Sequence, residues 1–378
     1  MRKQSLKQWL RDVKRAISQR QQNSGTATKK KTTLQEWRKV NAWIDQQIKN
    51  GLDITKAKKN KITLDLPERM NFSKNYNETI KYITFIRKIT ERKSTPRKAY
   101  KLVHVSFGKL KEISTSAALV LTAELSKWDD SLRNNLKPLT ENWDCNILQQ
   151  FHDLGFFDLF MKKPDRELPC AQQMKDEKRL VKYIKGRCGD AEKAKKLKEE
   201  IINIVGAKTL EKWTFLYSGL SEAITNVSHH AYPETYDYVD KDKNWYLTGS
   251  FNPKTRALKI VFYDQGISIP RSLPASKIWE RVLSFFDKYA IFDRKKDEVL
   301  LKAAVELDRT STNQNDRGKG LQDLLEFIRQ KGDGYLSIIS KRGLYKLTVT
   351  NGKETPKSDR FLDPLDGTLI IWNVTLND

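Results

Sequence analysis

The sequence is poor in cysteine and in acidic residues, and it has no long apolar run. Its three cysteines, Cys145, Cys170 and Cys188, are odd in number, far apart and not spaced as metal-ligand pairs. This pattern argues against a disulfide framework or a zinc site, and it predicts a protein of the reducing cytoplasm. No apolar run approaches the ~20 residues needed to cross a bilayer, and the N-terminus has no secretory signal. We therefore expect no membrane partner.

The shortage of acidic residues leaves the chain strongly basic. The 378 residues include 71 Lys and Arg but only 47 Asp and Glu, which gives a formal net charge of +24. Such a field favours anionic partners, such as nucleic acid, an acidic protein or anionic lipid. A lysine-rich solvated surface explains the same charge equally well, so both interpretations stay open. A hydrophobic content of 38% with nine Trp predicts folded domains, and the length allows two or three of them.

Residues 1–60 form a basic helical N-terminal segment, with helices expected at 4–22 and 33–49. Basic helices with interleaved tryptophan can hold nucleic acid through phosphate contacts and stacking. Here Trp9, Trp37 and Trp43 fall on the apolar side of their helices. Packing on this protein or on a partner protein is therefore the favoured interpretation, with nucleic acid as the alternative.

The stretch from Leu220 to Tyr232 predicts a helix with two distinct faces. Its apolar and small residues recur at helical spacing, so this face is expected to pack against a sheet. The same spacing puts Glu222, Asn226 and His230 one turn apart on another face. Such a row suits a nucleotide and metal site, because Mg²⁺ prefers oxygen ligands shared with phosphates and a carboxylate can act as a base. A solvated helix face is the alternative interpretation.

Three later stretches add to this row. An apolar strand ends in Asp264 and is followed by the turn residue Gly266. The stretch 316–321 is a glycine-rich turn that opens a helix, where free backbone N–H groups can hold phosphate. Further on, Gly367 and Thr368 lead into another apolar strand.

In this order the four pieces resemble the GHKL ATPase superfamily, which includes gyrase, heat-shock chaperones, histidine kinases and mismatch-repair ATPases. Within it, the run Glu-Ala-x-Thr-Asn-x-x-x-His-Ala-Tyr at 222–232 is most similar to the anti-sigma factor serine kinases. The resemblance covers about residues 206–378. It implies an α/β (α+β) fold in which a Bergerat-type ATP-binding α/β sandwich is built on a mixed sheet. It also implies ATP and Mg²⁺ as cofactors.

The resemblance gives each piece a role. It implies that Asn226 binds Mg²⁺, that Glu222 is the catalytic general base, and that Asp264 accepts the adenine amino group. Thr368 would support the same contact through water, and Gly266 would leave room for the base. Further nucleotide contacts are implied for His230, Ile269, Arg317, Gly318, Lys319, Gly320 and Leu321.

Two positions depart from the family pattern, because Ser268 and Gln322 stand where glycines are usual. The polar segment 309–316 is expected to act as a lid that orders over the triphosphate.

Alternating residues predict two antiparallel hairpins in this half of the chain. The first pairs 245–251 with 257–263, and the second pairs 335–340 with 345–350 around a turn at 341–343.

The N-terminal half shows a second, looser resemblance. Residues 101–107 predict a strand, and a turn then leads through hydroxyl residues into a helix at 117–128. A hydroxyl residue at this point is first of all a helix N-cap. The strand, the hydroxyl cluster and the helix are also similar to the anti-anti-sigma (STAS) fold. That resemblance implies that Ser116 or Ser114 is the phosphoacceptor of a partner kinase, with Ser116 preferred.

These assignments divide the chain into four parts. They are the basic segment at 1–60, a STAS-like α/β domain at 61–165, a connecting strand and helix at 166–205, and the ATP-binding domain at 206–378. A polar, proline-flanked loop at 162–169 marks the interior boundary.

Two functions are compatible with these features. The first is a GHKL-type ATPase or serine protein kinase, in which Glu222 activates a serine or a water molecule. The second is a nucleotide-gated interaction module that engages a protein or nucleic-acid partner with little or no catalysis. A homodimer, and a place in bacterial regulation or antiviral defence, are expected by analogy alone. A conventional histidine kinase is disfavoured, because the sequence shows no dimerising helical hairpin with an exposed histidine. His104 lies in an expected strand, and His152 lies in an expected helix near Gly155.

Overall fold

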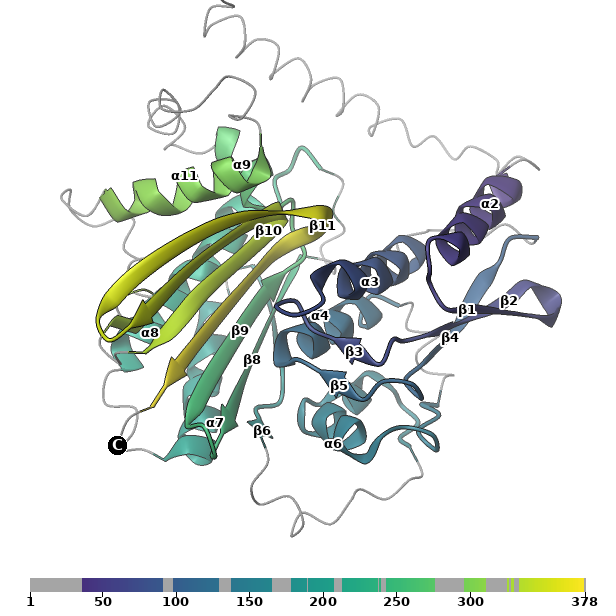
Figure 1. The fold of residues 1–378 in the computed structure, drawn as a ribbon, viewed down its shortest axis with the longest axis horizontal. Helices are drawn as coiled ribbons and strands as arrows, with labels where there is room; N and C mark the ends of the chain where they lie inside the picture. Colours follow the sequence, from purple (N-terminus) through teal and green to yellow (C-terminus); the bar gives the residue numbers. More distant parts are fainter. Residues whose placement is uncertain are drawn as a thin grey trace, which may run out of the picture.

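The fold is mixed α/β, with helices packed on multi-stranded sheets (Figure 1). The structure is a computed structural model. It describes residues 36–90, 98–128, 137–164, 178–188, 190–206, 213–236, 238, 243–275, 296–310, 325, 328–329 and 333–376. Within these ranges, no helix has the length and apolar character needed to span a bilayer.

A six-stranded antiparallel sheet forms the centre of the molecule. Its strands follow the order β10-β11-β9-β8-β6, and β7 also pairs with β8. Their bounds are β6 Arg179–Leu180, β7 Ile184–Arg187, β8 Asn244–Asn252, β9 Ala257–Asp264, β10 Gly334–Thr350 and β11 Lys353–Thr375. The first expected hairpin is confirmed by the β8–β9 pairing, in which Trp245 lies opposite Asp264. Strands β6 and β7 also belong to this sheet. The segment 166–205, which was expected to connect two domains, therefore contributes strands to the sheet itself.

The second expected hairpin is wrong. Residues 334–350 form one continuous strand, β10, and its partner is β11. The supposed turn is an irregularity in this pairing, where Lys341 has a positive φ of 53° and the register shifts on either side of it. The chain reverses instead at Asn351 and Gly352, which both have positive φ. An Asn-Gly pair of this kind is a strong hairpin signal.

Helices cover both faces of the large sheet, because alternate residues of its central strands point to opposite sides. Ile260 and Phe262 of β9 pack on one side, with α7 Ala194–Val205, α8 Trp213–Asn226 and α11 Asp297–Thr310. Val261 and Tyr263 pack on the other side, with α3 Tyr76–Thr90 and α4 Thr115–Leu125. We call these the α8 face and the α4 face. The sheet is therefore the middle layer of three.

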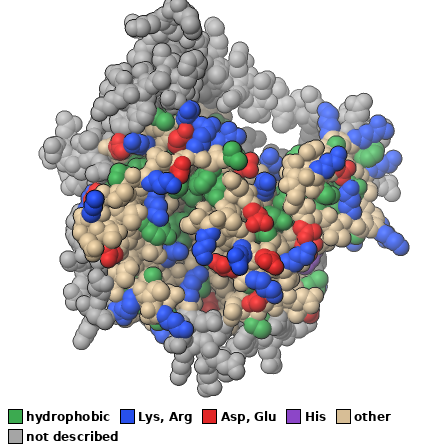
Figure 2. Space-filling model, in the orientation of Figure 1, with side chains coloured by type: hydrophobic (Ala, Val, Ile, Leu, Met, Phe, Trp, Pro, Cys, Tyr) green, Lys and Arg blue, Asp and Glu red, His purple; other side chains and the backbone are tan. Residues whose placement is uncertain are grey.

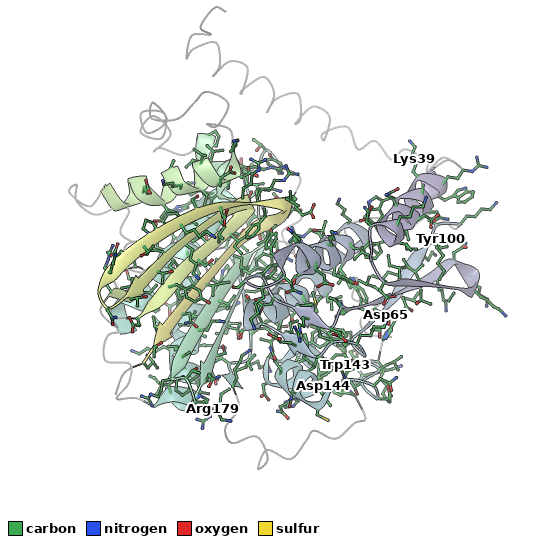
Figure 3. All side chains as sticks on the ribbon, in the orientation of Figure 1. Lys39, Asp65, Tyr100, Trp143, Asp144 and Arg179 are labelled. Atoms are coloured by element: carbon green, nitrogen blue, oxygen red, sulfur yellow. The ribbon has the colours of Figure 1, made fainter. Side chains whose placement is uncertain are left out.

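The N-terminal half contributes the α4 face and two small sheets. Strands β1 Ile54–Ala57, β2 Lys61–Asp65 and β4 Lys101–Ser106 form one sheet, in which β2 and β4 are parallel and α3 connects them. Strands β3 Arg69–Met70 and β5 Glu112–Ile113 form the other. Asp65 and Tyr100, labelled in Figure 3, lie in this part, whereas Arg179 lies at the far end of the large sheet.

The described part of the basic N-terminal segment packs on the protein itself. Helix α2 Glu36–Lys49 buries Ile44 and stacks Trp43 on Phe85 of α3, with ring centroids 5.3 Å apart. This confirms the expectation that Trp43 faces inward. Residues 1–35, including Trp9 and the first expected helix, lie outside the described residues.

The remaining elements are short connections. They are η1 Lys58–Asn60, α6 Cys145–Asp153, η2 Phe156–Leu159, η4 Ala191–Lys193, η6 Val227–Ala231, α9 Ile269–Ser272 and η8 Leu273–Ala275.

Candidate functional site

Helix α8 and the turn η6 that follows it carry the predicted row of polar residues. The buried side of the helix includes Leu220 and Ile224, which pack in the core of the α8 face as their spacing predicts. On its other side, Glu222 is half-buried, and Asn226 and His230 are exposed. The sequence therefore predicted correctly which side of this helix is buried and which is accessible.

The end of this helix departs from the expected regular geometry. Residues Val227–Ala231 form η6, a π-helical turn. Such turns are rare inside proteins and occur often at functional sites. His230 lies in this turn, where the partial burial of its ring and then the neighbouring His229 lower its pKa. The ring of His230 is therefore neutral at neutral pH and suits a hydrogen bond better than a charge contact.

Asp264, at the end of β9, is the most perturbed acid near this turn. Its side chain is buried, and its Oδ1 accepts a hydrogen bond of 2.8 Å from the backbone N–H of Gly266. Burial raises its pKa to about 7, and hydrogen bonds from Gly266 and Thr368 together with the charge of Arg87 offset only part of this effect. A buried acid that titrates near neutrality is a typical feature of a binding or catalytic site.

Gly266 joins this acid to the π-helical turn. A Cβ at this position would lie under 3.0 Å from the carbonyl oxygen and the Cβ of Ala231. The next residue, Ile267, donates its backbone N–H to the same carbonyl oxygen over 2.8 Å. The chain therefore requires glycine here, so that the turn after Asp264 can close on the end of η6.

Ser268 holds the backbone conformation that a glycine would adopt without strain. Its φ is 82° and its ψ is 153°, a region that side chains with a Cβ rarely enter. The short helix α9 begins directly after it and lies against η6.

Thr368 completes the cluster from the neighbouring strand. It lies directly opposite Asp264 in the β9–β11 pairing, and its Oγ1 is 3.1 Å from the hydroxyl of Ser340. That hydroxyl also accepts the backbone N–H of Ile269 over 2.9 Å. Ser340 was not predicted, because its role depends on the pairing of β10 with β11, whereas residues 335–350 were expected to form a hairpin of their own.

The structure therefore brings together Asp264, Gly266, Ile269 and Thr368, with η6 and His230 beside them. Glu222 and Asn226 stand on the helix that leads into this cluster. The predicted phosphate-binding residues Arg317, Gly318, Lys319, Gly320 and Leu321 lie outside the described residues. Among the described residues, no group of three or more His, Cys, Asp or Glu side chains is placed to hold a metal ion. A Mg²⁺ ion held by Asn226 would take its other oxygen ligands from phosphate and water.

The two predicted phosphoacceptor serines have structural positions. Ser114 is the N-cap of α4, and its side chain accepts the backbone N–H of Ala117 over 3.2 Å. Ser116 is only 4% exposed, and its hydroxyl lies 3.1 Å from that of Ser114. In this conformation a partner kinase cannot reach the hydroxyl of Ser116. The N-cap role, which the sequence indicates first, is the one that the structure shows for Ser114.

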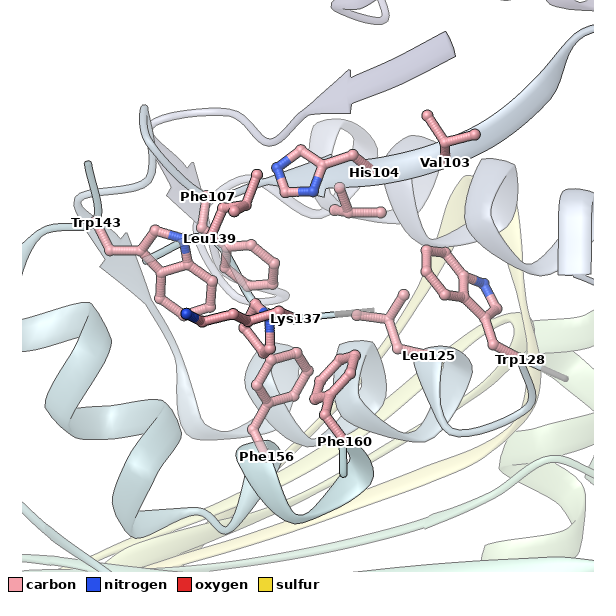
Figure 4. Close-up of a pocket in the computed structure, with 12 residues that line it drawn as sticks. Val103, His104, Phe107, Leu125, Trp128, Lys137, Leu139, Trp143, Phe156 and Phe160 are labelled. Atoms are coloured by element: carbon pink, nitrogen blue, oxygen red, sulfur yellow. The ribbon is translucent and has the colours of Figure 1, made fainter. Parts of the chain in front are cut away.

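A separate pocket lies within the N-terminal half (Figure 4). Its wall is mainly apolar and includes the aromatic rings of Phe107, Trp143 and Phe156, with His104 and Lys137 as its basic side chains. Burial lowers the pKa of His104, and the charge of Asp65 opposes this effect. None of the residues around Asp264 lines this pocket, so it takes no part in the candidate site.

Comparison of the chain with protein-family models, with curated proteins and with solved structures finds no match.

Proposed function

We propose that the chain is an ATP-binding regulatory protein, with a GHKL-type nucleotide site in its C-terminal half and a STAS-like N-terminal half. The observation that carries this proposal is the buried carboxyl of Asp264, between the Gly266 turn and Thr368. Recognition of the adenine amino group requires such an acceptor in otherwise apolar surroundings. Trp245, the cross-strand neighbour of Asp264 in β8, is fully buried and supplies part of these surroundings.

The protonation of Asp264 gives the proposal a pH dependence. With a pKa of about 7, this carboxyl is partly protonated at neutral pH. An amino N–H donated to it stabilises the ionised form, so adenine binding lowers the pKa and releases a proton. The affinity for ATP is therefore expected to rise as the pH increases through about 7.

The phosphates are assigned to the other side of the cluster. Asn226 is exposed and would offer one oxygen to Mg²⁺, and Glu222, one turn earlier on α8, would orient or deprotonate a nucleophile. Bound Mg²⁺ would neutralise the charge of the triphosphate. The glycine-rich segment 317–320 would contribute backbone N–H groups to the same phosphates.

Two activities remain candidates for this site, and different observations favour them. The N-terminal half packs directly on the large sheet through α3 and α4, which supports a nucleotide-gated interaction module. The presence of Glu222 and Asn226 on one side of α8 supports phosphoryl transfer to a separate protein. Burial of Ser116 argues against transfer to that residue of the same chain.

The partner is proposed to be a protein, with nucleic acid or a second copy of the chain as alternatives. Figure 2 shows Lys and Arg side chains spread over the visible face, with Asp and Glu between them. Among the described residues of this face, the positive charge is therefore distributed and does not form one basic patch, which favours a protein partner over nucleic acid.

Calorimetric titration with Mg·ATP tests nucleotide binding. We expect wild-type protein to bind Mg·ATP more tightly at about pH 8 than at about pH 6, and to bind Mg·GTP weakly, because guanine presents a carbonyl oxygen where adenine has its amino group. Asp264→Asn is expected to weaken ATP binding at least tenfold, on the order of 1.4 kcal/mol. The matched control is Asp359→Asn, an exposed carboxylate on β11 that pairs with Lys357. Absence of heat with well-folded wild-type protein would rule out the nucleotide site.

Transfer from labelled ATP separates the two activities. A kinase or ATPase would release or transfer the label in the wild type and lose this activity in Glu222→Ala, while retaining ATP binding. A nucleotide-gated module would bind ATP without turnover, and Glu222→Ala would leave its behaviour unchanged.

A further inference from the structure

A largely buried cluster of charged and polar side chains lies between the large sheet and the N-terminal half, and of its members only Asp366 has a substantially exposed side chain. Two of its members come from the N-terminal half and four from the sheet region. They are Arg87, Glu124, Tyr263, Gln265, Lys341 and Asp366. Buried charges are rare in proteins unless they are paired, and a network with several members fixes one specific arrangement of its parts.

The centre of the cluster is the pair formed by Arg87 of α3 and Glu124 of α4. Arg87 is 4% exposed and Glu124 is fully buried. Nε of Arg87 donates to Oε2 of Glu124 over 3.0 Å, and Nη2 contacts the other carboxylate oxygen. This two-point geometry is the strong form of an arginine–carboxylate pair. Burial opposes ionisation of Glu124, but Arg87 and further positive and donor groups hold its pKa down at about 2.

The pair fixes the residues on either side of Asp264. The hydroxyl of Tyr263 lies 2.9 Å from Oε1 of Glu124 and also contacts the Arg87 guanidinium. Nε2 of Gln265 donates to the same carboxylate oxygen over 2.9 Å. Asp264 points to the other side of the sheet, so its position is set by two neighbours that Glu124 holds.

The same guanidinium reaches the second strand of the candidate site. Nη1 of Arg87 lies 3.3 Å from Oδ2 of Asp366, and Lys341 contacts the other carboxylate oxygen. Asp366 stands two residues before Thr368. Lys341 directly follows Ser340, whose hydroxyl reaches both Thr368 and Ile269. Both strands that carry the proposed adenine contacts are therefore tied to Arg87.

We propose that Arg87 is a positioning residue for the nucleotide site, which it holds in shape from the N-terminal half through Glu124 and Asp366. This inference rests on the proposed nucleotide binding and extends it. ATP binding would depend on the packing of α3 and α4, and ATP would in turn stabilise that packing, since the coupling between two sites is reciprocal.

The electrostatics of Asp264 provide a readout that a purely structural role would not move. The Arg87 charge lowers the pKa of Asp264 against the effect of burial. Asp264 also interacts electrostatically with the titratable side chains of Cys188, Tyr232, Tyr238 and Tyr263. Among the described residues, Arg87 is a positively charged group that lowers the pKa of Asp264, so its removal raises the pKa of that carboxyl. The pH at which ATP affinity rises should then move upward.

The test compares Arg87→Gln and Arg87→Lys with the wild type by calorimetric titration with Mg·ATP across the pH range. Arg87→Gln is expected to weaken binding by about tenfold at neutral pH and to shift the pH profile upward. Arg87→Lys keeps the charge but loses the two-point geometry, so it should keep the wild-type pH profile and lose affinity. The matched control is Arg69→Gln, an exposed arginine of the N-terminal half whose ion pair with Glu112 spans 3.8 Å.

Each result decides one question. If Arg87→Gln does not fold, the double variant Arg87→Met with Glu124→Leu replaces the pair with apolar side chains and is tested in its place. Unchanged affinity and an unchanged pH profile in the folded variant would overturn the role of Arg87, while nucleotide binding would stand. Absence of binding by the wild type would remove the nucleotide site, and the role of Arg87 with it.

Discussion

Two buried carboxyls lie on opposite faces of the same sheet, and their acidities are shifted in opposite directions. Glu124, on the α4 face, has a pKa of about 2, and Asp264, on the α8 face, has a pKa of about 7. Both are almost completely buried, so burial raises the pKa of each. The difference comes from their partners. Glu124 touches the guanidinium of Arg87, whereas the hydrogen bonds of Asp264 come from neutral donors at Gly266 and Thr368.

This difference separates a structural acid from one suited to binding. A carboxylate whose charge is matched inside the protein stabilises one arrangement and has little left to offer a ligand. A carboxyl buried without a matching charge is costly, and a ligand that donates to it recovers part of that cost. The comparison therefore favours Asp264 as the binding acid and Glu124 as the residue that fixes its surroundings.

The largest predicted effect comes from breaking the pair on the α4 face. Glu124→Ala leaves the Arg87 charge buried without its main partner, and it is expected to cost about 3–5 kcal/mol of unfolding free energy at neutral pH. Urea denaturation followed by fluorescence measures this loss. The double variant Arg87→Met with Glu124→Leu should restore most of it, because buried pairs are often replaced by apolar groups without loss.

The same pair predicts the direction of the acid sensitivity. The folded pKa of Glu124 lies below its ordinary value of 4.5, so its contribution is complete above about pH 4.5 and is lost as the pH falls toward 2. In the double variant this part of the acid sensitivity should disappear. If wild type and double variant lost stability equally between about pH 4.5 and pH 2, Glu124 would not be the paired acid described above.

Truncating an apolar side chain on the α8 face should lower the free energy of unfolding by an amount similar to that for Glu124→Ala. This loss should not depend on pH. Ile224 of α8 is 1% exposed in an apolar cluster, so Ile224→Ala is expected to cost about 2–5 kcal/mol. The conservative Ile224→Val should cost only about 0.5–1.5 kcal/mol. Denaturation at neutral and at acidic pH checks whether the cost stays constant. A cost that varied with pH would show that charges also stabilise this face.

Replacing the buried acid on the α8 face should raise the free energy of unfolding above about pH 7, whereas Glu124→Ala lowers it. The folded pKa of Asp264 lies above its ordinary value of 3.8, so the unfolded chain loses this proton first as the pH rises. Between about pH 4 and pH 7 the buried acid therefore becomes progressively more destabilising, and the penalty is complete above about pH 7. Asp264→Asn should stabilise the unliganded protein at about pH 8 by up to about 4 kcal/mol, and this gain should vanish below about pH 4.

Thermal unfolding at both pH values measures this gain, and Asp359→Asn serves as the exposed control. A variant that is more stable but no longer binds ATP would identify Asp264 as a residue kept for function at a cost in stability. Destabilisation at about pH 8 would mean instead that the carboxyl stabilises the turn at Gly266.

Local patterns in the sequence were sufficient for the α8 face. The helical spacing of Leu220 and Ile224 identified the buried side of α8, and the alternation through β8 and β9 identified two paired strands, although both strands are buried along almost their whole length. Such signals act over a few residues, and each reports which side of its own element is apolar. Asp264, Gly266 and Thr368 also stand at strand ends or turns with a recognisable local pattern, but their proposed roles came from the family resemblance.

The α4 face could not be predicted in this way. Arg87 and Glu124 are 37 residues apart, and Arg87 and Tyr263 are 176 residues apart, so no local pattern relates them. Their contact depends on α3 and α4 packing against the large sheet, which the division into separate domains did not anticipate. The error in β10 had a different origin, because the signal at Asn351-Gly352 was present but the turn was assigned to Lys341-Arg342-Gly343.

The smallest predicted effect concerns the start of α4, the helix that carries Glu124. Ser114→Ala removes the N-cap hydrogen bond to Ala117 and should cost about 1 kcal/mol, whereas Ser114→Asp retains an acceptor and should cost much less. The comparison, made by urea denaturation, tests whether the hydroxyl of Ser114 is needed for capping or for modification. If alanine and aspartate were equally damaging, the hydroxyl would act through Ser116, 3.1 Å away, and not through the helix end.

The burial of Ser116 gives a separate prediction. Mass spectrometry after incubation with Mg·ATP should find phosphate on Ser116 only under conditions that also unfold the start of α4, because that serine is buried in the folded protein.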